Sequence, residues 1–248
     1  MNPVRLTRFG FPVRWLAVAL LVAGAARAQT SEPWPTVPLP PHAKVEWVAD
    51  RMKVNGIPMR LMRFESTARR SEIVAYYTAH WSGAYPTKPS VRPLAEATLV
   101  GQAHGPYYMT VKVVDRPHDA SGGFISVSQV LGNRVERSAG GLPLMPGAKV
   151  VSVVESSDPG KQSRDLVIVQ DAAPDPASSY YQVALENAGW HRVQNTPTDS
   201  AHPRQAGSLA VFQRDQSELS ISVVQVDGQR GSTLIANLVT KGTGLSAE

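Results

Sequence analysis

The histidines are the side chains of this sequence best suited to acid–base or metal chemistry near neutral pH, but their spacing supports neither role. No two of them stand four residues apart on an expected helix, and no His-Glu-x-x-His sequence occurs, so no zinc site of that kind is predicted. His118 precedes Asp119, which could orient its ring, yet both lie in an expected loop among glycine and serine residues. The six histidines are His42, His80, His104, His118, His191 and His202.

Nucleophiles for catalysis are equally hard to place. The chain contains no cysteine, which excludes a thiol nucleophile, a cysteine-based metal site and a disulfide bond. It also lacks the Gly-x-Ser-x-Gly, Ser-x-x-Lys and P-loop patterns that position a reactive serine or a phosphate. Glu65 and Glu72 flank an expected helix start, and we assign them to solubility and helix capping. We therefore predict no catalytic residue, no metal ligand and no cofactor, and a hydrolase ranks third among the candidate functions.

Aromatic side chains are the better candidates for a binding surface. Tyr76-Tyr77 and Tyr180-Tyr181 occupy corresponding places in two expected helices. Adjacent helical residues point about 100° apart, so one tyrosine of each pair can enter the core while the other lies at its rim. The pairs could form grooves for a glycan or peptide, but we favour a role in anchoring each helix on its sheet. The candidate ligand- or partner-binding residues are Trp47, Met59, Tyr76, Tyr77, Trp81, Tyr180, Tyr181 and Trp190.

Large apolar side chains are dense around the first expected hairpin, which carries Trp47, Met52, Met59 and Met62. One hairpin does not need so many, so some of them could form a contact between units or an exposed, adaptable patch. Ordinary core packing is the interpretation we favour, because large apolar residues are usually buried.

An internal repeat organises the elements that would position these residues. Residues 39–45 read LPPHAKV and residues 144–150 read LMPGAKV, with five of the seven positions identical. Further along, Leu99 aligns with Leu209, and the alternating run Met109, Val111 and Val113 aligns with Leu219, Ile221 and Val223 at the same offset of 110 residues. We predict a tandem duplication.

The expected fold class is α+β, with two β-β-α-β-β-β units that each form an antiparallel sheet with one helix packed on a face. Asn55-Gly56 predicts a tight hairpin turn in the first unit, because both residues tolerate positive φ. One helix cannot cover both faces of a five-stranded sheet, so the other face needs solvent, the sister unit or a partner. The expected segments are strands over residues 44–54, 57–64, 97–102, 107–114 and 124–131, a helix over 71–81, strands over 150–154, 166–169, 209–213, 218–226 and 232–239, and a helix starting near 176.

The N-terminus has the layout of a secretory signal: a basic leader, the apolar run 15–26, and Ala26-Arg27-Ala28 as a cleavage site. The apolar run is too short to span a bilayer, which takes about 20 residues, although an uncleaved anchor is an alternative. We expect cleavage after Ala28, a periplasmic or secreted location, and no stable membrane insertion afterwards. The expected divisions are the signal peptide 1–28, a proline-rich extended spacer 29–41, a first repeat 42–132, a linker 133–142, a second repeat 143–240 and a tail 241–248.

The charge balance restricts the possible partners. Four of the 25 basic residues lie in the leader, which leaves 21 against 20 acidic residues after cleavage. A nucleic-acid partner is not expected, since neutralising phosphates needs a concentrated basic surface. We expect a non-enzymatic periplasmic protein that binds another protein or assists envelope or secretion assembly. The alternative is a binding protein for a small ligand such as a glycan, lipid or peptide. The sequence leaves the oligomeric state open.

Overall fold

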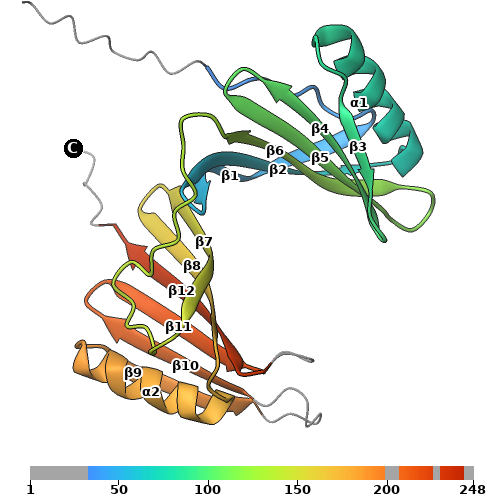
Figure 1. Ribbon diagram of the computed structural model, residues 1–248. Coiled ribbons are helices and arrows are strands. Elements are labelled where there is room, and N and C mark those ends of the chain that lie inside the picture. The colour runs from blue at the N-terminus through green and yellow to red at the C-terminus, as the bar shows by residue number, and fades with distance from the viewer. Residues whose placement is uncertain (1–32, 199–206, 226–229, 243–248) are drawn as a thin grey trace, which may run out of the picture. The chain divides into compact units, whose positions relative to one another are not determined.

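The computed structural model describes residues 33–198, 207–225 and 230–242, so the predicted signal peptide lies outside the described residues. Two helices and twelve strands make up this part of the chain (Figure 1). The first seven elements are β1 (Ala43–Val54), β2 (Ile57–Ser66), α1 (Arg70–Ala84), β3 (Ser90–Pro93), β4 (Ala97–His104), β5 (Tyr107–Asp115) and β6 (Ser121–Gln129). The others are β7 (Lys149–Asp158), β8 (Lys161–Gln170), α2 (Pro174–Asn187), β9 (His191–Thr198), β10 (Gly207–Arg214), β11 (Ser217–Val224) and β12 (Ser232–Lys241).

All twelve strands belong to one antiparallel sheet, in the order β3-β4-β5-β6-β2-β1-β7-β8-β12-β11-β10-β9. The predicted fold class, a tandem α+β repeat of β-β-α-β-β-β units with separate sheets, is therefore wrong. The two short helices, α1 with 15 residues and α2 with 14, accompany one continuous sheet. The join is the pairing of Met52, Lys53 and Val54 with Ser156, Glu155 and Val154. An unpaired strand edge leaves backbone N–H and C=O groups without partners. Where β1 and β7 pair, these groups hydrogen-bond across the two strands.

The two edge strands, β3 and β9, were not predicted. β3 has only four residues, all of them exposed, so it carries no alternation of buried and exposed positions for a sequence pattern to detect. It ends at Pro93, a residue that cannot donate to a ladder and is tolerated at a sheet edge. The hairpin prediction is confirmed, because Asn55 and Gly56 have φ of 50° and 79° between β1 and β2.

Each helix lies on its own part of the sheet: α1 contacts β4 and β5, and α2 contacts β9 to β12. On α1 the buried residues Ile73, Tyr77 and Trp81 recur every four positions and form one face. Glu72 caps this helix, since its carboxylate accepts a hydrogen bond from the Arg69 backbone N–H at 2.8 Å. Two hydrophobic cores result, one under each helix.

The described part of the proline-rich segment, residues 33–41, packs on the first core instead of forming a free spacer. Val37 is buried there, and the Trp34 ring lies 5.0 Å from that of Tyr107. The Tyr77 hydroxyl donates to the Pro38 carbonyl at 2.6 Å. Within the described ranges no helix is long and apolar enough to cross a membrane.

Candidate binding site at the join of the sheet

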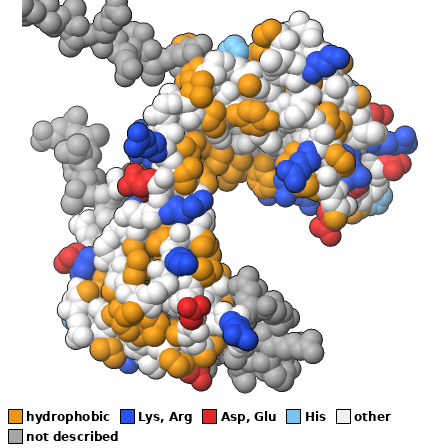
Figure 2. All heavy atoms as spheres, viewed as in Figure 1, with side chains coloured by type: hydrophobic (Ala, Val, Ile, Leu, Met, Phe, Trp, Pro, Cys, Tyr) orange, Lys and Arg blue, Asp and Glu red, His pale blue; other side chains and the backbone are white. Residues whose placement is uncertain are grey.

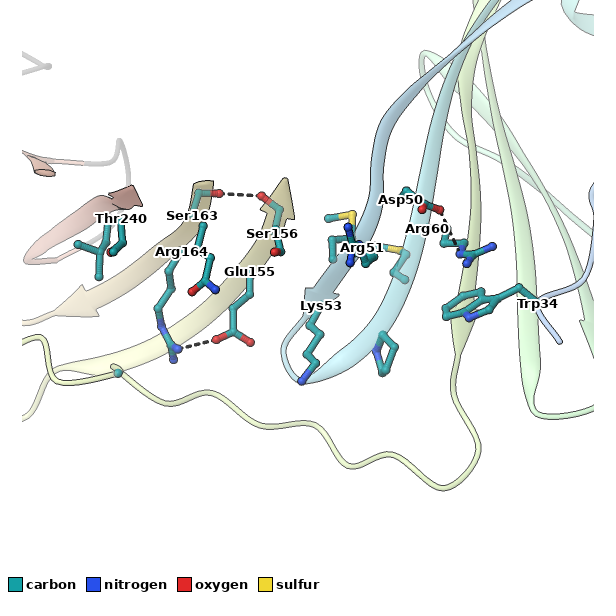
Figure 3. A pocket seen from close by; sticks show the side chains of 17 residues that line it. Trp34, Asp50, Arg51, Lys53, Arg60, Glu155, Ser156, Ser163, Arg164 and Thr240 are labelled. Carbon is teal, nitrogen blue, oxygen red and sulfur yellow. Dashed lines mark hydrogen bonds and ion pairs between the residues drawn. The ribbon is translucent and has the colours of Figure 1, made fainter. Parts of the chain in front are cut away.

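A cavity of about 580 Å³ lies where β1 pairs with β7 (Figure 3). Strands β1, β2, β7, β8 and β12 contribute to its wall, together with Trp34 before β1 and Gly140 after β6. Its apolar lining comes from Trp34, Met52, Pro58, Met59 and Leu238, and its uncharged polar lining from Ser156, Ser157, Gln162, Ser163 and Thr240. The cavity therefore combines a polar strand surface with large, adaptable apolar groups.

Two of the four basic side chains in this cavity are already paired. The Arg60 guanidinium lies 3.3 Å from the Asp50 carboxylate and 4.9 Å from the centre of the Trp34 ring (Figure 3). Arg164 donates to Glu155 at 2.6 Å and to the Ser138 carbonyl at 2.6 Å. These pairs hold the walls of the cavity in place and neutralise both of its acidic groups.

Arg51 and Lys53 are the two remaining basic side chains, and both are exposed residues of β1. Neither forms an ion pair within the described residues. Lys53 stands opposite Glu155 in the β1–β7 register, but that carboxylate already accepts from Arg164. The lining thus has an excess of two positive charges, concentrated on one strand.

The chain segment between β6 and β7 supports the cavity through Arg164. A Cβ at Gly140 would lie 2.6 Å from the Arg164 Cζ, so only glycine allows the backbone to approach this guanidinium so closely. The Gly140 φ of 61° also favours glycine. The Arg164 Nε is buried and has no hydrogen-bond partner, although the side chain as a whole is 22% exposed.

Asn55 fixes the tip of the β1–β2 hairpin against β7. Its backbone N–H donates to the Val153 carbonyl at 2.7 Å, and its Oδ1 accepts from the Val153 N–H at 2.8 Å. Its carbonyl accepts from the Glu136 N–H at 2.8 Å. One residue therefore holds the hairpin, β7 and the segment between β6 and β7 together beside the cavity.

Of the eight residues predicted from sequence to bind a ligand or partner, Met59 lines this cavity. Tyr77, Trp81, Tyr181 and Trp190 lie in the two cores, where they anchor the helices. Tyr76 and Tyr180 are half-buried, and the Tyr180 hydroxyl donates to the Leu144 carbonyl at 2.8 Å. Trp47 is 55% exposed. For the seven predicted residues other than Met59, binding of a ligand or partner stays a prediction.

Burial raises the pKa of the Tyr77 and Tyr181 hydroxyls above the usual value for tyrosine. Both hydroxyls stay protonated at neutral pH and act as donors, Tyr77 to the Pro38 carbonyl and Tyr181 to Gln170 Oε1 at 2.8 Å. They are thus structural groups of the core.

Clusters of metal-ligating side chains are not found among the described residues. No three His, Asp or Glu side chains in the described ranges come together as a metal site would require. Asp119, considered above as a partner for His118, instead lies 3.5 Å from the Arg69 guanidinium in an exposed turn. The lining of the cavity contains serine hydroxyls but no histidine, and Ser156 and Ser163 hydrogen-bond each other at 2.7 Å.

Sequence reasoning singled out Met52 and Met59 but missed Trp34, Arg51, Lys53 and Arg164. The charged run from Asp50 to Lys53 beside a predicted hairpin was the available signal. It could not identify the site, because the cavity depends on β7 and β8, about a hundred residues away in the chain, pairing with β1.

No protein-family model matches the chain, and no curated protein matches its sequence. Two solved structures resemble it over most of their length. One is the immunity protein TplEi of T6SS from Pseudomonas aeruginosa complexed with an "L" peptide, with 12% identity, 85% of each chain covered and a TM-score of 0.29. The other is the apo form of TplEi, with 10% identity, 84% of this chain and 85% of that chain covered, and a TM-score of 0.26. Such TM-scores are too low to show a shared fold, and nothing about function follows from them.

Proposed function

We propose that this chain is an exported, non-enzymatic protein that binds a segment of another protein in the cavity at the β1–β7 join. The observation that carries the proposal is the lining of that cavity, where Arg60 lies over Trp34 and where Arg51 and Lys53, which form no ion pair within the described residues, accompany Met52 and Met59. Aromatic, methionine and arginine side chains are the types enriched where proteins bind each other. We propose a periplasmic or secreted location from the signal-like residues 1–28. The proposed function includes a role in envelope or secretion assembly.

The surface outside the cavity supports a protein partner over a nucleic acid. On the face seen in Figure 2, basic and acidic side chains are scattered among apolar and polar ones, without a continuous basic surface. A nucleic-acid-binding protein concentrates its basic residues along the path of the phosphates.

Site-specific photo-cross-linking in the native host tests the proposal. A photoreactive amino acid replaces Met59 in the cavity and, as the control, Val183, which is exposed on α2. We expect a discrete cross-linked protein from position 59 and none from position 183. The proposal fails if position 59 gives no adduct, or if both positions give the same adducts.

A small-ligand binding protein is the second candidate function, and the volume of the cavity favours it. About 580 Å³ lies within the range of roughly 300–1,000 Å³ typical of small-molecule sites. Thermal unfolding with a panel of glycans, lipids and peptides tests this alternative, because a ligand that binds only the native state must raise the midpoint. No shift with any class contradicts it.

A further inference from the structure

Arg51 and Lys53 stand two residues apart on β1, and both line the cavity. The β1–β2 register shifts between Ala49 and Met52, so Arg51 lies in an irregular stretch of the strand. At about 3.3 Å per residue, the backbones of Arg51 and Lys53 are at most roughly 7 Å apart along β1. Carboxylates at alternate residues of an extended peptide have the same separation, because they project from the same side of its backbone. The two cations therefore match a ligand with paired negative charges at this spacing.

The surroundings of the two cations favour a peptide over an inorganic anion. Met52 and Met59 are paired in the β1–β2 register, and both line the same cavity as the two cations, so apolar surface adjoins the charges. Across the join, Ser157 and Gln162 offer donors and acceptors on β7 and β8, beside Ser156 and Ser163, which hydrogen-bond each other. Such groups can satisfy the backbone of a bound segment, whereas a free anion gains nothing from the apolar part of the lining.

We infer that the cavity binds an extended acidic segment of a protein, with carboxylates at two alternate positions. This inference rests on the proposed function and specifies the chemistry of the partner. The attraction comes from charge complementarity with Arg51 and Lys53, while Arg60 and Arg164 remain engaged with the protein's own acids.

Fluorescence anisotropy with a labelled, capped Ala-Glu-Leu-Glu-Ala peptide tests the inference, with Ala-Gln-Leu-Gln-Ala as the uncharged control. We expect the Arg51→Gln/Lys53→Gln protein to bind the acidic peptide at least about tenfold more weakly than the unsubstituted protein. The matched control is Lys112→Gln/Lys149→Gln, which removes the same charge from exposed residues outside the cavity. Its affinity should change less than about twofold, because exposed charges farther than a Debye length away are largely screened.

Three results overturn the inference: equal losses in both double variants, equal binding of the two peptides, or no detectable binding of the acidic peptide. Competition by glutarate as effective as competition by unlabelled peptide overturns the assignment to a peptide and indicates a small-anion site. Unchanged melting temperatures keep the comparison valid, since neither cation loses an ion pair to the residues that the structure describes. If cross-linking from position 59 persists in Arg51→Gln/Lys53→Gln, the proposed function stands and the charge-based inference fails. If position 59 never cross-links, the proposed function fails whatever the peptide does.

Discussion

At the residue scale, Asn55 is the point where the hairpin, β7 and the segment between β6 and β7 meet. It combines a positive φ with three hydrogen bonds, two to Val153 and one to Glu136. Asparagine suits this position because it tolerates left-handed backbone and carries a short side-chain acceptor.

Replacing Asn55 tests this role. Asn55→Gly keeps the positive φ but leaves the Val153 N–H without its side-chain acceptor, which costs about 1–3 kcal/mol. Asn55→Ala adds backbone strain of about 1 kcal/mol, so it should be the less stable of the two. Urea unfolding measures both free energies. Two variants as stable as the unsubstituted protein contradict the account.

The buried tyrosines predict how stability depends on pH. The pKa of Tyr77 is raised above 10.0, the value it takes in the unfolded chain, and that of Tyr181 is raised in the same direction. As pH rises, the unfolded chain therefore loses these protons first. The stabilisation is complete well below pH 10 and declines above it, by at most about 1.4 kcal/mol per pH unit for each tyrosine, until the pH reaches the folded-state pKa of that tyrosine.

Unfolding in urea between pH 8 and pH 11 measures this decline. In Tyr77→Phe/Tyr181→Phe, the free energy of unfolding should fall less steeply above pH 10 than in the unsubstituted protein. At pH 8 the double variant should be the less stable protein, because the Pro38 carbonyl and Gln170 Oε1 each lose a hydrogen-bond donor. The same slope in both proteins would mean that other groups cause the decline.

At the element scale, the sequence predicts local elements but not the pairing of β1 with β7. The first hairpin, the capping role of Glu72 and the apolar alternation of β5 and β11 are local patterns, and they were read correctly. Pairing of β1 with β7 is not local. It leaves no periodic signal, and it changes two expected sheets into one.

The segment between β6 and β7 packs on Arg164 through Gly140, and the neighbouring Gly141 provides a matched control. Gly140→Ala places a methyl group 2.6 Å from the guanidinium carbon, whereas Gly141→Ala meets nothing within 4 Å. Both glycines have positive φ, 61° and 89°, so both variants carry similar backbone strain. Gly140→Ala should be the less stable by about 1–2 kcal/mol, because only there must a neighbour move. Equal melting temperatures would show that this contact is unimportant.

At the scale of the whole molecule, a continuous sheet with two helix-covered cores leaves a lined cavity between the parts that the helices cover. The sequence showed the absence of cysteine and predicted the first hairpin and the alternation of β5 and β11. It could not indicate the cavity, because Trp34, Lys53 and Arg164 come together only when distant strands pair. The buried tyrosines Tyr77 and Tyr181 are recognisable in the sequence but lie in the two cores, so a repeated aromatic motif can reflect helix packing alone.

Backbone amide chemical shifts of the ¹⁵N-labelled protein, recorded while the acidic Ala-Glu-Leu-Glu-Ala peptide is added, test the central claim most directly. Binding in the cavity predicts that the largest changes fall on the neighbouring strands β1, β7 and β8, around Lys53, Ser156 and Ser163. Amides of β4 and β5 should change little. Changes centred elsewhere on the sheet, or no changes at any peptide concentration, would contradict the assignment of this cavity as a binding site for acidic protein segments.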